Sequence, residues 1–460
     1  MVNKDTIVAR STPPGKSAIA VIRISGPDAL NIVAKRCRKQ QLVELESREL
    51  LFTRLWDEVD ELLDEVVLAC FPGPASYTGE NVVEISCHGS EFIVQQITEQ
   101  LVRDGARPAG PGEFTMRAFF NGKLDLAQAE AVIDLIDSET KSQHQLAVDQ
   151  MRGGFSKKIE ALREKLVHFA SMIELELDFG EEDVEFADRK ELGSLVEEIN
   201  AYIDRLLDSF SMGNAIKKGV CTVIAGRPNA GKSTLLNALL EEDRAIVSDI
   251  EGTTRDTIEE IIYLEGVPFR LIDTAGIREA GDTIEEIGIE KTMAKIAGSA
   301  ILIYVFDVKN TGPEEVLSDI EKVSGPNTQV IAVANKRDLV DEQLIKKSEQ
   351  KISQRAFFVT LSAIDQTGLD VLKGVLLKQF KQMSKGTTDT VLHNTRHYRS
   401  LLKTREALEA VLEGLENNMP ADLIAMDIRH AMNYLGEILG KGITSEDLLG
   451  NIFSRFCIGK

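Results

Sequence analysis

The stretch GRPNAGKS, Gly226 to Ser233, follows the apolar run Val220 to Ala225 and has the spacing of a phosphate-binding loop, or P-loop. In such a loop, backbone N–H groups and the N-terminus of the following helix bind phosphate oxygens. Lys232 would reach the terminal phosphates, and Ser233 would give its hydroxyl to Mg²⁺. The pattern predicts a nucleotide-binding protein. A glycine-rich turn without a ligand is the alternative for this stretch taken alone.

A second motif, NKRD at Asn335 to Asp338, follows the apolar run Gln329 to Ala334 and indicates the base. The Asp338 carboxylate can accept hydrogen bonds from the ring N–H and the exocyclic amine of guanine, whereas adenine would leave it unpaired. Sites built on such hydrogen bonds discriminate against a ligand that cannot form them by roughly four orders of magnitude. LSA, Leu361 to Ala363, would add backbone N–H groups for the guanine carbonyl. NKRD alone could be a helix cap, but its order and spacing after the P-loop favour a guanine site.

Two further motifs, DTAG and SDIEGTTRD, provide groups for Mg²⁺ and the γ-phosphate of the nucleotide. DTAG, Asp273 to Gly276, follows the expected strand Phe269 to Ile272. An Asp at this point can hold the water shell of Mg²⁺, and Gly276 can give its N–H to the γ-phosphate. Upstream, SDIEGTTRD, Ser248 to Asp256, supplies Thr254 as a second hydroxyl for Mg²⁺. Together with the P-loop and the base reader, these motifs predict a GTPase.

The residues for hydrolysis depart from the Ras pattern. Ile277 follows DTAG, where Ras-like enzymes place a water-orienting glutamine. Glu285, within the acidic stretch Asp282 to Glu286, could act through a bridging water, or it could be a solvated surface glutamate. Asn229 in the P-loop could hold a monovalent cation that replaces an arginine finger, or it could be a turn residue that tolerates left-handed geometry.

Composition frames these motifs. A chain of 460 residues, 43% of them hydrophobic, predicts about three domains with real cores. No apolar run approaches the roughly 18 residues of a membrane span, and the N-terminus lacks the apolar region of a signal peptide, so we expect a cytoplasmic protein without a membrane partner. The five cysteines lack CxxC spacing and indicate neither zinc nor disulfides. The net charge of -21 disfavours a broad basic surface, so any RNA partner must meet a local patch.

The GTPase module spans roughly Ile216 to Lys381, and both flanks show helical periodicity. Apolar residues recur at spacings of three and four before the module (Ile159, Leu162, Leu166, Phe169, Ile173, Leu177) and after it (Leu408, Leu412, Leu415, then Leu423 to Leu439). We expect one helical domain, interrupted by the GTPase module, whose halves pack together. Two separate bundles are the alternative. The acidic run Phe179 to Phe186 is typical of a solvated connection between helices.

The first ~120 residues have an α+β pattern. Strands are expected near Ala18 to Ser25, Val66 to Phe71 and Val82 to Cys87, and helices near Asp28 to Lys39 and Ser90 to Asp104. Arg23 lies in an apolar strand and would be costly if buried without a partner. It therefore needs a carboxylate, either an internal one such as Glu80 or one from a ligand.

Taken together, the motifs resemble those of the MnmE (TrmE) family of tRNA modification GTPases over essentially the whole chain. The stretches that carry the resemblance are DTIVARSTPPG (Asp5 to Gly15), SYTGENVVEISCHG (Ser76 to Gly89), PGEFTMRAFFNGKLDLAQAEAVIDLI (Pro111 to Ile136), GRPNAGKSTLLNAL, DIEGTTRD, DTAGIRE and FCIGK (Phe456 to Lys460). GTPases in general do not carry the outer segments, which lie before and after the GTPase module.

The resemblance implies a multidomain fold, α/β plus α. A tetrahydrofolate-binding and dimerisation domain of α+β type would span residues 1–120. A discontinuous helical domain would span residues 121–215 and 382–460, the second part ending in the CIGK motif. An inserted Ras-like P-loop GTPase domain would span residues 216–381.

The resemblance also implies roles for single residues. A tetrahydrofolate derivative, 5-formyl- or 5,10-methylene-tetrahydrofolate, would be held by Arg23, Glu80 and Lys123, with Lys460 beside it. Cys457 matches the family's cysteine, to which we assign no role. Glu285 matches the proposed general base. Potassium would be bound by Asn229, Ser248, Ile250 and Thr253, whose oxygen atoms suit a hard cation. Magnesium would be bound by Ser233 and Thr254.

The nucleotide site implied by motifs and resemblance draws on five segments. Its residues are Asn229, Ala230, Gly231, Lys232, Ser233, Thr234, Ser248, Asp249, Ile250, Glu251, Gly252, Thr253, Thr254, Asp273, Thr274, Ala275, Gly276, Asn335, Lys336, Asp338, Ser362 and Ala363.

The family reaction joins a folate methylene and an amine or glycine to carbon five of the wobble uridine of certain tRNAs. By resemblance, this chain would act as a homodimer with MnmG, a partner that uses FAD and NADH, in a heterotetramer or larger complex. GTP hydrolysis would drive a conformational cycle in which switch loops order and relax. Two rival functions are a ribosome-assembly GTPase, which would be expected to carry a basic RNA-binding appendage, and a folate-binding scaffold with a regulatory GTPase.

Overall fold

The computed structural model describes residues 5–38, 42, 48–178, 188–243, 259–273, 300–325, 328–383, 391–442, 449, 452–454 and 456–459. Two compact units emerge. The first comprises Met1–Asp137, Ala147–Ala187 and Glu413–Lys460, and the second comprises Ser138–Leu146 and Asp188–Leu412. Predicted sites on residues 244–258, 274–299 and Lys460 lie outside the described residues, as does the acidic run Phe179 to Phe186.

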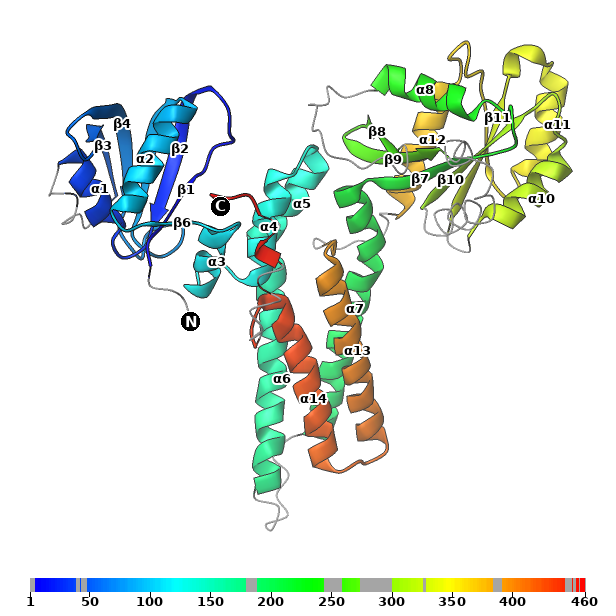
Figure 1. Cartoon of the computed structure of the whole chain (residues 1–460). Helices are drawn as coiled ribbons and strands as arrows, with labels where there is room; N and C mark the ends of the chain where they lie inside the picture. The colour runs from blue at the N-terminus through cyan, green and yellow to red at the C-terminus, as the bar shows by residue number, and fades with distance from the viewer. Residues whose placement is uncertain are drawn as a thin grey trace, which may run out of the picture. The chain divides into compact units, whose positions relative to one another are not determined.

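The first unit contains a six-stranded sheet in the order β3-β4-β5-β2-β1-β6, with α1 and α2 on one face (Figure 1). Its elements are β1 (Ile7–Arg10), β2 (Ser17–Ser25), α1 (Ala29–Cys37), β3 (Glu49–Trp56), β4 (Leu62–Phe71), β5 (Val82–Gly89), α2 (Glu91–Arg103) and β6 (Arg107–Pro108). The strands and helices predicted here are confirmed, but β1, β3 and β6 were not predicted.

Alternation along the strands explains how this sheet is layered. Ala20, Ile22 and Ile24 of β2 are buried in one core with both helices, whereas Arg23 points to the opposite face. The same period of two places Arg23 directly across from Glu84 of β5. That pairing brings Arg23 and Glu84 together on the sheet face opposite α1 and α2.

Helices complete the first unit: α3 (Glu113–Phe120), α4 (Leu126–Ile136), α6 (Gly154–Asp178) and α14 (Ala421–Leu439), while α5 (Lys141–Met151) crosses from one unit to the other. Asp125 caps α4: its carboxylate accepts from the Gln128 backbone amide, and the side-chain oxygen of Gln128 accepts from the Asp125 backbone amide. The predicted apolar face of α6 is buried and packs against α14. The pair is also joined by Arg429–Glu174 at 2.5 Å.

The second unit contains the P-loop fold. Its sheet has the order β12-β11-β10-β7-β9-β8, and only β8 runs antiparallel. The strands are β7 (Val220–Ala225), β8 (Glu259–Leu264), β9 (Val267–Asp273), β10 (Ile301–Asp307), β11 (Gln329–Asn335) and β12 (Phe357–Thr360). Every residue of β10 is buried, as a central parallel strand requires.

Helices cover both faces of this sheet (Figure 1). Ile303 and Val305 of β10 face α8 (Lys232–Asp243) and α12 (Leu369–Met383), whereas Tyr304 and Phe306 face α10 (Pro313–Val323) and α11 (Glu342–Ile352). The short helix η2 covers Arg337–Leu339. The carboxyl ends of the parallel strands therefore meet at one edge, where ligands of such folds bind.

Two long helices of the second unit pair before and after the P-loop fold. The α7 helix (Arg189–Lys218) and α13 (Thr395–Glu416) are joined by stacking of Phe210 on Tyr398 with ring centroids 4.2 Å apart. The Ser209 hydroxyl also accepts a 3.0 Å bond from the Leu392 amide. Like α6 with α14 in the first unit, this pair joins one helix from before the GTPase module with one from after it. Within the described ranges, no helix is both long and apolar enough to span a bilayer.

Candidate functional sites

The P-loop connects β7 to α8, and close contacts require two of its glycines. Gly226 has φ +150°, and a Cβ there would lie 2.0 Å from the carbonyl oxygen of Val305 on β10. Gly231 has φ +96°, and its Cβ would lie 2.2 Å from Nδ2 of Asn335. Only glycine fits at such positions. The loop backbone therefore lies directly against β10 and the NKRD motif.

The lysine and the asparagine of the loop have distinct placements. Lys232 begins α8, and its Nζ donates to the carbonyl oxygens of Gly226 and Arg227, each at 3.1 Å. Asn229 is exposed and has φ +60°, a left-handed conformation that asparagine tolerates. The loop thus curls around the Lys232 ammonium with Asn229 at its outer side.

Arg227 anchors the loop from outside, a contact that the sequence did not reveal. Its Nε donates to Asp319 of α10 at 2.7 Å, and its guanidinium also pairs with Glu315. The Tyr304 hydroxyl donates to the same Asp319 carboxylate at 2.6 Å. The P-loop is therefore fixed at its base to α10 and β10.

Asn335 links three of the predicted motifs. Its Nδ2 donates to the carbonyl of Ala230 in the P-loop at 2.9 Å, and its Oδ1 accepts from the Ala363 amide of LSA at 3.0 Å. The side chain is 3% exposed. Because a buried amide with both ends bonded has one orientation, Asn335 holds the P-loop, the NKRD segment and LSA in one site. Asp338 lies in η2, directly after this junction.

Asp307, at the end of β10, was not predicted to belong to this site. Its Oδ2 accepts from Lys336 Nζ at 2.8 Å and its Oδ1 from the Lys309 amide at 3.0 Å. Burial alone would raise the pKa of Asp307, but the bonds from Lys336, the Lys309 amide and Asn310 outweigh it and hold the pKa below its usual value. Lys336 itself has φ +65°. Asp307 therefore holds the side chain of Lys336, whose backbone has a conformation that few non-glycine residues adopt.

We expect an Asp307→Asn variant to bind GDP about tenfold more weakly, since it loses a charge-assisted bond to Lys336 but keeps the side-chain shape. Titration with a fluorescent GDP analogue measures the change. Asp370→Asn, an exposed position in the first turn of α12, is the matched control. Equal affinity of the two variants would contradict this role for Asp307.

A second group of predicted residues gathers in the first unit. Arg23 pairs with Glu84 through Nε at 2.9 Å and Nη2 at 2.7 Å, and its guanidinium lies over the rings of Tyr77 and Phe114. Of the two alternatives predicted for Arg23, an internal carboxylate or one from a ligand, the structure shows an internal one, but it is Glu84 and not Glu80. Glu84 stands opposite Arg23 in the β2–β5 register, which sequence alone does not give.

Glu80 instead belongs to a buried network around Arg117. Its carboxylate accepts from the Ser25 hydroxyl at 2.7 Å and from Arg117 at 3.2 Å. Arg117 is 2% exposed and also bonds Asp5 at 2.6 Å and Glu113 at 3.1 Å. Glu80 is thus held in place by a buried cation.

The C-terminal segment reaches the same region. Ser11 donates to the Gly459 carbonyl at 3.1 Å, and Arg23 Nη1 donates to it at 3.4 Å. Ile458 forms a bridge with Pro111, between β6 and α3. Lys123 follows α3 and donates to the Pro74 carbonyl at 3.0 Å. The structure brings Arg23 and the residue before Lys460 together, although 436 residues separate Arg23 from Gly459 in the sequence.

Comparison with known protein families decides what this chain is. A model described as the MnmE helical domain matches residues 126–457, and a model described as the GTP-binding protein TrmE N-terminus matches residues 6–123. The chain belongs to the MnmE family. Relatives named tRNA modification GTPase MnmE extend over almost the full length. The relative from Cytophaga hutchinsonii is 51% identical in an alignment that covers 99% of this chain and 98% of the relative's own length. That of Christiangramia forsetii is 50% identical over 99% of both.

Membership in the MnmE family makes this chain a GTP hydrolase that acts in tRNA modification. The predicted family and fold class are confirmed: an N-terminal α+β domain, helices from both sides of an insert, and a P-loop GTPase fold. Magnesium is the usual companion of GTP in such enzymes. Within the described ranges, no group of three or more His, Cys, Asp or Glu could hold a metal by itself.

Several MnmE positions predicted for the site lie outside the described residues. They are Ser248, Asp249, Ile250, Glu251, Gly252, Thr253, Thr254, Thr274, Ala275, Gly276, Glu285 and Lys460. Asp273 is described as the last residue of β9, in register with Ile224 of β7. Its backbone therefore stands at the same sheet edge as the P-loop.

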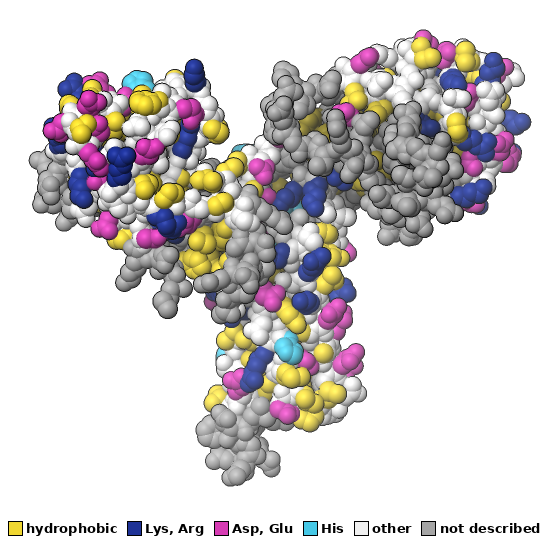
Figure 2. Space-filling view, in the orientation of Figure 1, with side chains coloured by type: hydrophobic (Ala, Val, Ile, Leu, Met, Phe, Trp, Pro, Cys, Tyr) yellow, Lys and Arg dark blue, Asp and Glu magenta, His cyan; other side chains and the backbone are white. Residues whose placement is uncertain are grey.

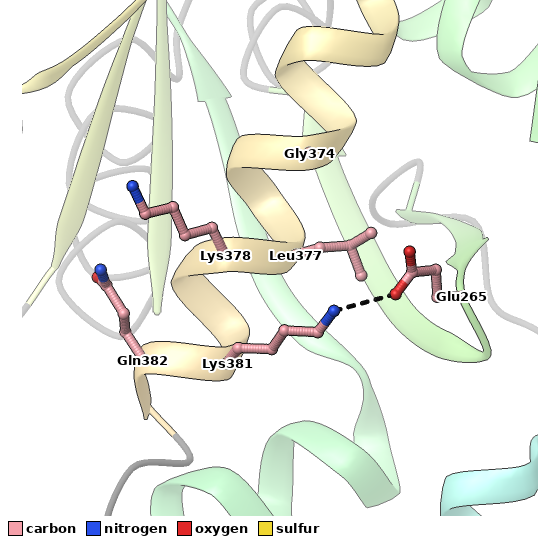
Figure 3. Close-up of a pocket in the computed structure, with 6 residues that line it drawn as sticks. All are labelled: Glu265, Gly374, Leu377, Lys378, Lys381 and Gln382. Carbon is pink, nitrogen blue, oxygen red and sulfur yellow. Dashed lines mark hydrogen bonds and ion pairs between the residues drawn. The ribbon is translucent and has the colours of Figure 1, made fainter.

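A surface hollow of about 290 Å³ lies elsewhere on the GTPase unit of this MnmE chain (Figure 3). It is lined by Glu265, Gly374, Leu377, Lys378, Lys381 and Gln382, and Lys381 bonds Glu265 at 3.1 Å across it. None of these residues belongs to the nucleotide motifs. The hollow separates the end of α12 from the β8–β9 turn.

Proposed function

We propose that this chain is a potassium-dependent GTPase that works with MnmG, a FAD-dependent partner, in the cytoplasm. Together they would install a (carboxymethyl)aminomethyl group at carbon five of the wobble uridine of certain tRNAs, with a folate as one-carbon donor. The observation that carries the GTPase part is Asn335, which bonds both the P-loop and LSA. Full-length similarity to tRNA modification GTPases carries the choice of substrate.

In this proposal the nucleotide lies along the edge formed by the ends of β7, β10 and β11. The P-loop amides and Lys232 bind the phosphates, Asp338 accepts from guanine, and the Ala363 amide lies beside the base. Lys232 would exchange its bonds to the Gly226 and Arg227 carbonyls for phosphate oxygens. Asp307 orients Lys336 and so supports the base reader without touching GTP.

Ser233 and Thr254 would give hydroxyl oxygens to Mg²⁺, which neutralises charge on the β- and γ-phosphates. Ser233 lies in the first turn of α8, directly after Lys232, which fits this role. Potassium would be held by Asn229, Ser248, Ile250 and Thr253. The exposed, left-handed Asn229 fits a ligand that approaches from outside the loop. Glu285 would position the attacking water as general base.

A tetrahydrofolate derivative would bind between Arg23, Glu80, Lys123 and Lys460. The donor set suits it, since a folate has a glutamate tail that needs cations and a polar pterin that needs a carboxylate. Arg117 and Ser25 keep the Glu80 carboxylate oriented, and its oxygens have lone pairs left for pterin N–H groups. When bound, the folate supplies the one-carbon unit; the residues here bind and orient it.

We expect a Glu80→Gln variant to bind 5-formyl-tetrahydrofolate at least tenfold more weakly, because the amide replaces a charged acceptor by a partly donating group. Equilibrium dialysis with the radiolabelled folate gives the affinity. Glu99→Gln, whose carboxylate bonds Gln95 on the surface of α2, serves as control. The single tryptophan, Trp56 on β3, reports whether the domain stays folded. Unchanged folate affinity in a folded Glu80→Gln protein would exclude Glu80 from the site.

A homodimer is also part of the proposal. On the sheet face that α1 and α2 leave open, Leu50 is 74% exposed and Phe52 is 65% exposed, and Phe52 stands opposite the exposed Val67. Contiguous apolar surface of this kind is typical of a protein contact. We assign it to a second copy of this chain.

Reconstitution tests the whole proposal. The purified chain is mixed with MnmG, GTP, Mg²⁺, potassium, a folate labelled in its one-carbon unit, and unmodified tRNA. Digestion and mass spectrometry of nucleosides should show the label at carbon five of the wobble uridine only when both proteins are present. A ribosome-assembly GTPase would leave the tRNA unmodified. A folate-binding scaffold would still support modification after loss of Thr254 or Glu285.

A further inference from the structure

Two neighbouring segments of the second unit form a local basic surface. Residues 209–218 at the end of α7 and residues 391–405, which include the start of α13, contain no Asp or Glu. At the chain-wide ratio of 74 acidic residues in 460, these 25 residues would hold about four. They carry Lys217, Lys218, Arg396, Arg399, Lys403 and Arg405 instead. In a chain of net charge -21, such a patch stands out from its surroundings.

The two segments lie side by side. The Leu392 amide bonds Ser209, and a Cβ on Gly213 would lie 2.1 Å from the Leu392 carbonyl oxygen, so the backbones are in direct contact. Phe210 stacks on Tyr398. Lys and Arg side chains gather over this part of α7 and α13 in the space-filling view (Figure 2). The two basic segments are therefore neighbours in the second unit.

Within this surface, Arg396, Arg399 and Lys403 form a basic stripe along one face of α13. Their spacing of three and four residues puts them on the same side of the helix over about 10 Å. Arg399 and Lys403 are exposed. Arg399 and Lys218 make no ion pair or hydrogen bond with any residue in the described part of the chain. Arg405, by contrast, is neutralised by Asp204 at 3.3 Å and Glu409 at 3.5 Å.

We infer that the basic stripe, with Lys218, binds the phosphate backbone of the tRNA. A row of cations on a rigid helix matches a row of phosphates, and contacts of this type position a nucleic acid without reading its sequence. The aromatic rings at this place, Phe210 and Tyr398, stack on each other and are half-buried, whereas a platform for bases needs an open ring face. The inference rests on the proposed action on tRNA and gives it a site on this chain, beyond whatever MnmG contributes.

The test compares two double variants of the full-length chain. Arg399→Glu with Lys403→Glu reverses the stripe. Lys346→Glu with Lys347→Glu on α11 makes the same charge change on another exposed helix of the same unit and is the control. Binding of fluorescein-labelled tRNA is followed by anisotropy over a series of salt concentrations. The GTP hydrolysis rate confirms that each variant is folded.

The stripe variant should bind tRNA at least tenfold more weakly near 0.1 M salt, and its log–log salt slope should fall by about two, one for each lost phosphate contact. The control should stay within twofold of wild type. Unchanged affinity and slope in the stripe variant would overturn the inference. So would absence of tRNA binding by the wild-type chain. Modification of tRNA by wild type in the reconstituted reaction would, in each case, leave the proposed function standing.

Discussion

An Asp338→Asn variant should bind GTP and GDP roughly four orders of magnitude more weakly than the wild type. The carboxylate accepts two N–H groups of guanine, whereas an amide presents its own N–H₂ group to at least one of them. Xanthine has a carbonyl in place of the guanine amine, so the same variant should gain affinity for xanthosine nucleotides. Competition of GTP and XTP against a fluorescent analogue measures both changes.

The control for this experiment is again Asp370→Asn, which should bind GTP like the wild type. An Asp338→Asn variant that kept its preference for GTP over XTP would show that the guanine is read elsewhere. Loss of affinity for both nucleotides, with no gain for XTP, would indicate damage to the site and not a change of base preference.

The second large effect concerns the stability of the first unit. Replacing Arg117 by Met would leave Asp5, Glu80 and Glu113 without their shared buried cation. Removing one partner of a buried ion pair costs about 3–5 kcal/mol in free energy of unfolding. Urea unfolding followed by Trp56 fluorescence should show a midpoint lowered by roughly 1–3 M. Arg103→Met, which loses only an exposed 3.6 Å pair with Glu58, should shift it little.

The same network predicts how acid acts on the unit. The hydrogen bond from Arg107 lowers the pKa of Asp5; burial opposes this shift, and a bond from Arg117 adds to it. Burial would raise the pKa of Glu113, but hydrogen bonds from Arg107, the Gly110 amide and Arg117 outweigh burial and lower it. The stability from these ion pairs is therefore present above the unfolded pKa of about 4 and is lost as pH falls through the folded values. Equal acid sensitivity of Arg117→Met and wild type would contradict this assignment.

The sequence predicted those parts of the fold that depend on local pattern. The strand Val220 to Ala225 matched β7, and the apolar face of α6 was buried as its spacing required. The β3 strand was missed because Leu50 and Phe52 are apolar but exposed, which removes the alternation by which a strand is recognised. With four residues, β1 is too short to show a period.

Within the two sites, sequence motifs identified many of the site residues but not the residues to which they are hydrogen-bonded. That the P-loop, NKRD and LSA meet was predictable from their order, whereas the bridging role of Asn335 needed the coordinates. Asp307 and Arg227 carry no motif signal, since their roles depend on which strand and helix lie beside the loop. The apolar strand around Arg23 was enough to predict that Arg23 needs a carboxylate partner. Only the register of β2 and β5 identified Glu84.

The central claim, a GTPase that uses potassium held by Asn229, is tested most directly by GTP hydrolysis in potassium and in sodium buffer at equal ionic strength, with Asn229→Ala measured alongside. We expect potassium to stimulate the wild type strongly and Asn229→Ala not at all, while both proteins retain GDP binding. Equal rates of the wild type in the two salts would contradict it and point to a GTPase activated by an external partner.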